Sequence, residues 1–171
     1  MTDPVLRLER LEVDFLGETD VVSAVSDVSL SVAPGEVVGI VGESGCGKST
    51  LALATMGLLT GRTRVGGSIN FDGQELVGLP EKQRRKLRGD RMAMVFQDPL
   101  TSLDTNSGIL EQVADAIRAH RDLTKSEARQ RALLLLKYFG IPASDRRYDD
   151  PPHRLSGGMR QRVVVAAAVA N

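Results

Sequence analysis

The chain is poor in the features that mark several classes of protein. Its 171 residues include one cysteine, which excludes an internal disulfide and fits a reducing compartment. The 22 basic and 22 acidic residues cancel, so no global field attracts nucleic acid or anionic lipid. Apolar runs such as Val163–Ala170 fall short of the ~20 residues that a membrane-spanning helix needs. The N-terminus has no basic segment followed by an apolar run, so no secretory signal is predicted. We expect a soluble, cytoplasmic protein that can still dock against a membrane protein.

The most informative stretch is a glycine-rich loop with the pattern G-x-x-x-x-G-K-[ST]. The residues before it, Glu36–Val41, are predicted to form a buried strand, and Thr50–Met56 can continue from it as a helix. Strand, loop and helix in this order are the context in which the motif binds phosphates. The motif and the residue after it are Gly42, Glu43, Ser44, Gly45, Cys46, Gly47, Lys48, Ser49 and Thr50.

The chemistry of this loop suits a triphosphate. Glycines let the backbone curl so that N–H groups point at a phosphate chain, and a helix N-terminus adds partial positive charge. Lys48 can reach the terminal phosphates, and the Ser49 hydroxyl can ligate Mg²⁺. The alternative is a chance glycine-rich turn, which the flanking strand and helix disfavour. We therefore predict a nucleoside-triphosphate site.

Apolar periodicity predicts a β-rich first half and a helical second half. Alternation within residues 6–15 and 28–32 indicates half-exposed strands, and residues 66–73 predict a short strand that ends in an Asp-Gly turn. The mostly apolar run Arg91–Phe96 is predicted to be a strand buried on both faces. Apolar residues recur at helical spacing in residues 109–117.

Two capping signals predict where the later helices begin. Thr124–Glu127 is a capping box that opens a helix ending at Gly140. Ser156 is expected to cap a last helix, from Gly157 to about Ala170.

Two further motifs follow the loop. Gln97 comes directly after the predicted strand Arg91–Phe96, and Leu155–Arg162 reads Leu-Ser-Gly-Gly-Met-Arg-Gln-Arg. In isolation, Gln97 could be a solvated loop residue and Ser156 an ordinary helix start. Their order after a phosphate loop favours a functional role for both. A helix N-terminus with a serine and two glycines is a second candidate anion site.

With these motifs in place, the chain resembles the ATP-binding cassette (ABC) family over essentially its whole length. Gly42–Thr50 looks like the family's phosphate loop, Gln97 like its Q-loop glutamine, and Leu155–Arg162 like its signature, which other P-loop ATPases lack. Residues 96–103 and 152–159 look most like importers of dipeptides, oligopeptides or nickel. The resemblance implies an α/β P-loop NTPase fold: a core with an antiparallel β part (1–100), a helical subdomain (101–155) and a signature helix (156–171).

The resemblance also implies a function. The chain would be the ATP-binding subunit of an importer, coupling ATP hydrolysis to the transport of peptides or similar small solutes. Two subunits, identical or different, would pack head to tail. The signature residues of each, Ser156, Gly157 and Gly158, would then cap the γ-phosphate held by the other's loop. The helical subdomain would bind membrane-spanning permease subunits, and through them indirectly a solute-binding protein, at the cytoplasmic face of the membrane.

Three single residues receive roles from the same resemblance. Gln97 would contact the attacking water and, with Ser49, the Mg²⁺ ion. Phe15 would stack on adenine, although a core phenylalanine at a strand end is the alternative.

The family pattern continues past the signature helix with a strand ending in Asp, then a catalytic Glu and a switch His. The sequence stops at Asn171, before all three. This predicts a fragment that lacks the C-terminal part of its core and does not hydrolyse ATP. The alternative function is a nucleotide- or partner-binding fragment without turnover. A small P-loop kinase with Asp98 as its metal acid is a more distant class, which the signature disfavours.

Three other features predict no function. The basic run of residues 84–88 is interpreted as a solvated loop or helix face, because the net charge is zero and no aromatics interleave, so no nucleic-acid partner is expected. His120 and His153 lack acidic or cysteine partners at metal-ligand spacing and are assigned to no metal. Cys46 is assigned no catalytic role.

Overall fold

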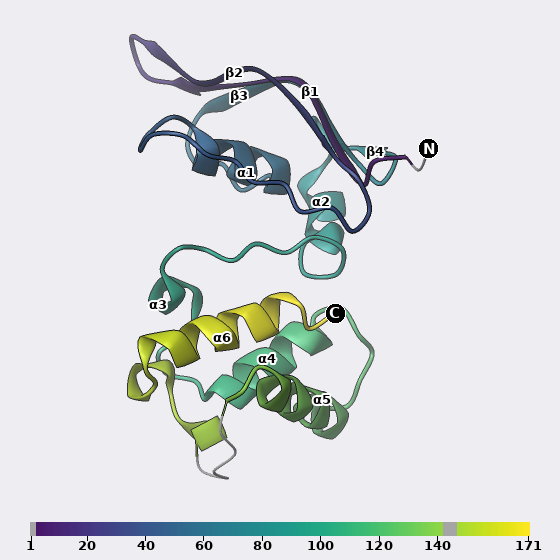
Figure 1. Ribbon diagram of the computed structural model, residues 1–171, viewed down its shortest axis with the longest axis vertical. Helices are drawn as coiled ribbons and strands as arrows, with labels where there is room; N and C mark the ends of the chain where they lie inside the picture. The colour runs from purple at the N-terminus through teal and green to yellow at the C-terminus, as the bar shows by residue number, and fades with distance from the viewer. Residues whose placement is uncertain (1–2, 142–146) are drawn as a thin grey trace. The chain divides into compact units, whose positions relative to one another are not determined.

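The computed structural model describes residues 3–141 and 147–171, which fall into two compact units, Met1–Arg85 and Lys86–Asn171 (Figure 1). The three-part division expected from the sequence stays a prediction. The first unit contains β1 (Leu6–Leu16), β2 (Val21–Val32), α1 (Lys48–Met56), β3 (Thr63–Phe71) and β4 (Gln74–Glu75), and α2 (Glu81–Leu87) crosses into the second. The second contains α3 (Pro99–Ser102), α4 (Ile109–Arg118), α5 (Lys125–Tyr138), the 3₁₀ turns η1 (Arg147–Asp149) and η2 (Pro152–Arg154), and α6 (Gly157–Ala168).

The first unit is an antiparallel sheet with α1 along one face (Figure 1). Its strand order is β2-β1-β3-β4, and all three strand pairs are antiparallel. The core is formed by apolar residues of β1, β2 and β3, with Leu76 after β4 and with Leu51 and Ala54 from α1. The predicted Asp-Gly turn joins β3 to β4 and is confirmed, since Asp72 and Gly73 both have positive φ, 50° and 81°.

A β-bulge explains why β1 does not alternate strictly. Leu8 and Leu11 are both buried although they are three residues apart, whereas strict alternation would place them on opposite faces. The register between β1 and β3 shifts between Glu9 and Glu12, and Arg10 has a φ of 44°. Opposite the shift, a Cβ on Gly67 would overlap the Arg10 carbonyl oxygen. The extra residue thus returns Leu11 to the core face.

Two strands predicted from the sequence do not form, and those predictions are wrong. Glu36–Val41 has no strand assignment, and Val37 and Val41 are 95% and 94% exposed. Within Arg91–Phe96, Met92 makes only an isolated bridge to Arg88. A strand buried on both faces needs neighbours whose backbone groups pair with its own. The sheet that the described residues build uses β1 to β4 alone.

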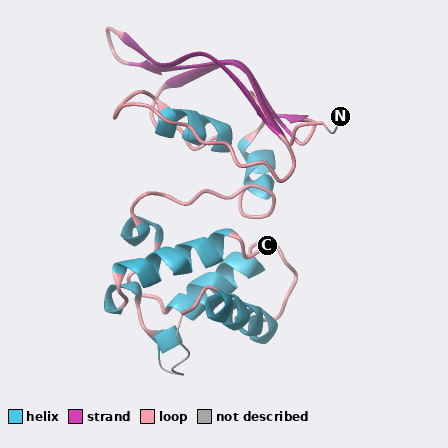
Figure 2. Cartoon of the chain, in the orientation of Figure 1, coloured by secondary structure: helices cyan, strands magenta, loops and turns pink. Residues whose placement is uncertain are grey.

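The second unit is helical (Figure 2). Ile109, Val113 and Ile117 of α4 pack with Ala128, Ala132 and Leu136 of α5 and with Val163 and Ala166 of α6 in one buried cluster. The apolar spacing predicted for residues 109–117 is therefore confirmed. Among the described residues, no helix is long and apolar enough to cross a membrane.

Both predicted helix starts are confirmed. The Thr124 backbone N–H donates to the Glu127 carboxylate over 2.8 Å, and the Glu127 N–H donates to the Thr124 hydroxyl, which completes the capping box. At the other end, Gly140 has a φ of 69°, the left-handed conformation that commonly follows a helix. The Ser156 hydroxyl accepts a hydrogen bond from the Met159 N–H over 3.3 Å and caps α6.

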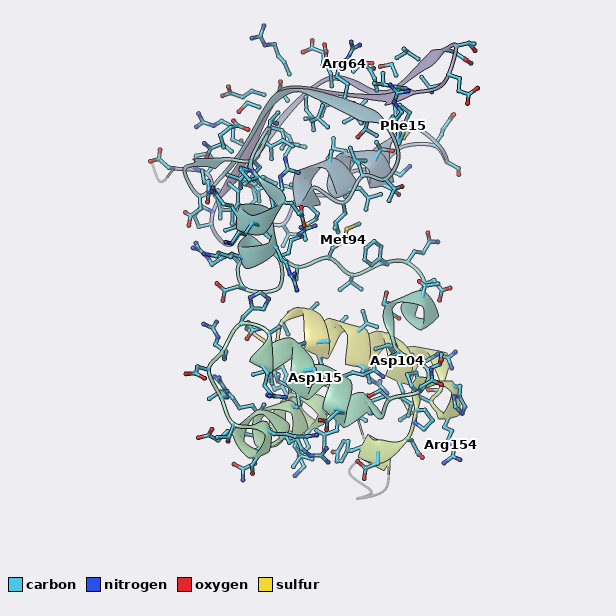
Figure 3. The ribbon with its side chains drawn as sticks, turned by 180° about the vertical axis from the view of Figure 1, so that it is seen from behind. Phe15, Arg64, Met94, Asp104, Asp115 and Arg154 are labelled. Atoms are coloured by element: carbon cyan, nitrogen blue, oxygen red, sulfur yellow. The ribbon has the colours of Figure 1, made fainter. Side chains whose placement is uncertain are left out.

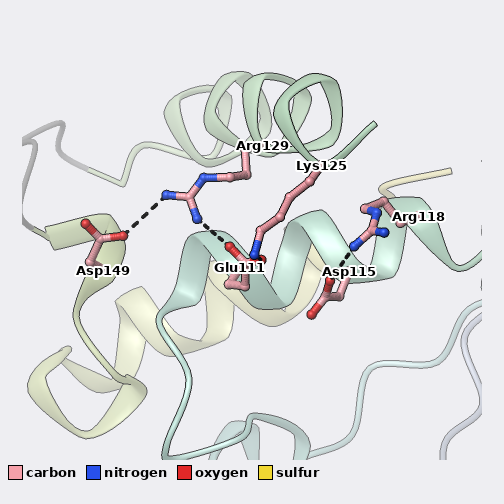
Figure 4. A network of polar contacts seen from close by, with 6 residues as sticks. All are labelled: Glu111, Asp115, Arg118, Lys125, Arg129 and Asp149. Carbon is pink, nitrogen blue, oxygen red and sulfur yellow. Dashed lines mark hydrogen bonds and ion pairs between the residues drawn. The ribbon is translucent and has the colours of Figure 1, made fainter. Parts of the chain in front are cut away.

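A carboxylate on α4 joins the helices of this unit (Figure 4). Glu111 lies 2.7 Å from the Lys125 ammonium and also accepts from Arg129, which lies 3.5 Å from Asp149. Hydrogen bonding from Lys125, and then from Arg129, holds the pKa of Glu111 below its ordinary value, against the opposing effect of partial burial. The contact thus links α4, α5 and η1.

We predict that Glu111→Gln destabilises the chain at pH 7 by about 0.2–1 kcal/mol, because the network is partly exposed. The folded pKa lies below the ordinary 4.5, so the stabilisation is present above pH 4.5 and is lost as pH falls through the folded pKa. Urea unfolding from pH 7 to pH 3 measures it. Asp115→Asn is the control, because Asp115 makes one exposed ion pair with Arg118 on the same helix. Equal stability of Glu111→Gln and wild type at pH 7 would contradict the prediction.

Candidate functional site

The glycine loop closes around its own lysine. Lys48 Nζ donates to the carbonyl oxygens of Gly42 over 2.8 Å and Glu43 over 2.6 Å, and it lies 3.4 Å from the Cys46 Sγ. The Cys46 N–H donates back to the Glu43 carbonyl over 3.4 Å. The ammonium is therefore held inside the curve of the loop by main-chain acceptors. A phosphate oxygen reaching this position would meet a positive charge that is already in place.

Two glycines are required by the shape of this loop. Gly45 and Gly47 have φ values of 82° and 93°, which L side chains rarely adopt. At Gly47 there is also no space, because a Cβ would overlap the Ala24 carbonyl oxygen of β2 and lie 3.5 Å from Val25 Cγ2. A Cβ on Gly45 would have no described heavy atom within 4 Å. The backbone of β2 is thus a wall of the site, and no local signal in the sequence identifies it.

The N-terminus of α1 presents backbone donors beside the lysine. Its N-cap is Gly47, and no side chain caps it. The first intrahelical bond runs from the Leu51 N–H to the Gly47 carbonyl over 2.8 Å, so the N–H groups of residues 48–50 have no partner within the helix. The first turn also carries no acidic residue. Free donors, the helix dipole and an ammonium together fit a phosphate group.

Two further predicted site residues, Ser49 and Phe15, belong to the first unit. The Ser49 hydroxyl is on the exposed side of the first turn of α1. Phe15 is half-buried near the end of β1, where it pairs with Val22 of β2 and Thr63 of β3 (Figure 3). Its predicted role in adenine stacking stays a prediction. Among the described residues, no group of three or more His, Cys, Asp or Glu could hold a metal ion.

The second unit carries the other half of the predicted site. Gln97 is exposed in the segment that leads to α3. The Ser156 hydroxyl accepts from Met159, but its own proton remains available to donate to an anion. A Cβ on Gly158 would have no heavy atom within 4 Å, and one on Gly157 would have only Arg160 Nη2 at 3.9 Å, so the described backbone here is open. These features suit a phosphate approaching along the α6 axis.

The structure thus sorts the predicted residues into two sets. Phe15 and residues 42–50 belong to the first unit, and Gln97 with residues 156–158 belongs to the second.

The basic run of residues 84–88 departs in part from its interpretation as a solvated surface. Arg85 and Lys86 are exposed, whereas Arg84 is half-buried at the far end of α1.

The chain is similar to known proteins over almost its whole length. Residues 25–171 match the sequence profile of a family described as ABC transporter. The oligopeptide transport ATP-binding protein OppD of Escherichia coli (strain K12) is 42% identical over 167 residues, covering 98% of this chain and 50% of that protein. The dipeptide transport ATP-binding protein DppD of the same strain is 48% identical over 167 residues, covering 97% and 51%. The chain spans about half the length of the curated relatives that it matches.

Solved structures agree with this family. The dimeric post-hydrolysis state of the ATP-binding cassette MJ0796, bound to ADP and Pi, has a TM-score of 0.84 at 29% identity. The match covers 97% of this chain and 69% of that one. The cbiO1 protein of Clostridium perfringens, part of the ABC transporter complex cbiONQ, has a TM-score of 0.73 at 29% identity and covers 98% and 62%. The predicted fold class is confirmed.

We predict that Gly47→Ala destabilises the chain more than Gly45→Ala does. Both substitutions force a left-handed backbone on a residue with a Cβ, at about 1–2 kcal/mol. Only the first also pushes a methyl group into the Ala24 carbonyl oxygen. Thermal unfolding followed by circular dichroism measures the difference. The same loss of stability in both variants would contradict the close approach of β2 to the loop.

Proposed function

Because the chain belongs to the ABC transporter family, we propose that it is the ATP-binding subunit of an importer of peptides or similar small solutes. The observation that carries the proposal is the uncapped N-terminus of α1, with the Lys48 ammonium held beside its free N–H groups. The peptide specificity is supported by the names of relatives such as OppD and DppD.

In this function the loop binds the triphosphate of ATP. Lys48 exchanges the carbonyl oxygens of Gly42 and Glu43 for phosphate oxygens, and the N–H groups of the first turn donate to the same phosphates. The Ser49 hydroxyl would hold Mg²⁺, which would neutralise phosphate charge. Phe15 supplies the face on which adenine stacks.

The signature residues act on the nucleotide of a second subunit. Ser156 keeps a proton to donate, and the open backbone of Gly157 and Gly158 admits a phosphate. One chain therefore carries two different anion-binding surfaces. A head-to-tail dimer, with identical or different subunits, places each surface against the other across one ATP. The dimeric state of the MJ0796 cassette supports the formation of a dimer.

A groove on the second unit suits a membrane-spanning permease subunit. Its volume is about 380 Å³, and it is lined by Arg131, Leu134, Leu135 and Tyr138 of α5 and by Ala170. Tyr138 is 84% exposed, although it is a large side chain beside an apolar surface. A permease segment covering this groove would hold the subunit at the cytoplasmic face of the membrane.

Binding without turnover is the second candidate function for these 171 residues. The segments that flank the loop and Gln97, residues 36–41 and 92–96, form no strands, and none of their apolar side chains is buried. None of the motif residues is assigned the role of a general base. Phosphate binding depends on the first unit, whereas hydrolysis also needs groups that orient water.

We expect Lys48→Ala to weaken ATP binding by about 10- to 100-fold, because a hydrogen bond to a charged group contributes about 1.5–3 kcal/mol. Isothermal titration calorimetry with Mg-ATP measures the affinity. Lys82→Ala is the control, since Lys82 is an exposed lysine on α2 outside the loop. If wild type and Lys48→Ala bind ATP equally, the proposed function is wrong.

Bound nucleotide should shield Cys46 from alkylation. Cys46 is exposed, lies in the loop beside Lys48 and is the single cysteine, so the mass of the whole protein reports on it alone. We expect labelling by iodoacetamide to slow in saturating Mg-ATP for wild type and to stay unchanged for Lys48→Ala. An unchanged rate in wild type at saturation would place the nucleotide elsewhere.

We further predict that the 171-residue chain releases phosphate from ATP no faster than its own Lys48→Ala variant. General-base catalysis contributes about 10²–10⁴-fold, and neither Gln97 nor Ser156 supplies it. A coupled phosphate-release assay at several protein concentrations measures the rate. Turnover that depends on Lys48 would refute binding without hydrolysis and favour an active ATPase.

A further inference from the structure

The far end of α1 is held by one arginine. Gly57 follows the helix in the left-handed conformation, with a φ of 63° and a ψ of 38°. Its N–H donates to the Ala54 carbonyl over 3.0 Å, and the Leu58 N–H donates to the Leu53 carbonyl over 2.8 Å. A Cβ on Gly57 would overlap Arg84 Nη1 and lie 2.9 Å from Cδ and 3.0 Å from Cζ. The guanidinium therefore packs directly on the glycine that ends the helix.

The same guanidinium is bonded to the sheet. Arg84 Nη2 donates to the Leu76 carbonyl oxygen, and the Leu76 N–H donates to the Ile69 carbonyl of β3 over 2.8 Å. Leu76 and Ile69 are both buried in the core of the first unit. Arg84 thus connects the end of α1 to the β3–β4 hairpin through main-chain groups, which cannot rotate away as side chains can.

The placement of this arginine has a cost. Its Nε is buried and finds no acceptor in the part of the chain that the structure describes. Leaving a buried donor unsatisfied is unfavourable, so the contacts with Gly57 and Leu76 must offset it. A cation at a helix C-terminus is also favoured by the helix dipole. The next two residues of the basic run, Arg85 and Lys86, are exposed, so the half-buried position belongs to Arg84 and not to its neighbours.

At its N-terminal end, α1 is held where Gly47 meets the Ala24 carbonyl of β2, and between its two ends few of its residues are buried. Leu51, Ala54 and Thr55 are its only buried residues. The helix has nine residues and is therefore about 13 Å long. It transmits an axial shift at Gly57 to the N–H groups of its first turn. A binding site needs its groups placed to within about 0.5 Å, so a small shift matters.

We propose that Arg84 is a positioning residue for phosphate binding: it clamps the C-terminal end of α1 to the β3–β4 hairpin and so sets the place of the loop's donors. The inference rests on the proposed function, because it names a residue that serves the same phosphate site. Arg84 does not touch the phosphates itself.

The test compares Arg84→Met, which keeps the length of the side chain but removes the guanidinium, with Arg85→Met on the exposed side of α2. Two quantities are measured below the unfolding transition: the Kd for Mg-ATP by calorimetry, and the rate of Cys46 alkylation without nucleotide. Cys46 is exposed in the folded chain, so its labelling reports on the loop and not on global unfolding. We expect Arg84→Met to raise the Kd about 5-fold or more and to change the labelling rate at least ~2-fold. Arg85→Met should change neither.

A second variant keeps the test decisive if Arg84→Met fails to fold. Gly57→Asn retains a residue that tolerates the left-handed conformation, but its Cβ displaces the guanidinium. It should raise the Kd and change the labelling rate in the same way. Arg84→Lys keeps a cation without the planar fork and should not restore wild-type affinity.

The outcomes separate the two claims. Wild-type Kd and labelling in Arg84→Met, or in Gly57→Asn if the first does not fold, would overturn the clamp and leave the proposed function intact. Wild-type ATP affinity in Arg84→Lys would overturn the clamp as well. So would a loss of ATP affinity in Arg85→Met as large as the loss in Arg84→Met. If wild type itself binds no ATP, the proposed function fails, and the labelling rates still decide whether Arg84 positions the loop.

Discussion

The close approach of β2 to the glycine loop is the constraint on which the candidate site depends. The Ala24 carbonyl occupies the space that a side chain at position 47 would need, so the loop must turn there with glycine geometry. That turn ends the loop at Gly47 and begins α1 at Lys48. The lysine consequently points back into the loop, where the Gly42 and Glu43 carbonyls hold it. The register of the antiparallel sheet, which places Ala24, therefore determines where the phosphate donors lie.

Features fixed by neighbouring residues could be predicted from the sequence. The capping box at Thr124, the cap at Ser156 and the Asp-Gly turn each depend on contacts within a few residues, and each is present. The order of the motifs likewise predicted the family. Features fixed by distant residues could not be predicted in this way. Ala24 lies 23 positions before Gly47 and Arg84 lies 27 positions after Gly57, and neither contact leaves a local pattern.

The two predicted strands that do not form also show that a local pattern does not reveal contacts with distant residues. Residues 36–41 and 91–96 have the apolar composition of buried strands, but composition does not supply the neighbours that satisfy their backbone groups. None of their apolar side chains is buried in the described chain. The phosphate-binding loop nevertheless keeps its shape, because its walls come from β2 and α1 rather than from these segments.

The central claim is that the N–H groups at the start of α1 bind the phosphates of ATP, and amide hydrogen–deuterium exchange tests it most directly. Exchange is followed in peptides covering residues 42–51, with and without Mg-ATP, in wild type and Lys48→Ala. The account predicts that ATP slows exchange in these peptides of wild type, and that the variant needs a higher ATP concentration for the same slowing. Unchanged exchange in this segment of wild type at saturating ATP, or the same ATP dependence in both proteins, would contradict it.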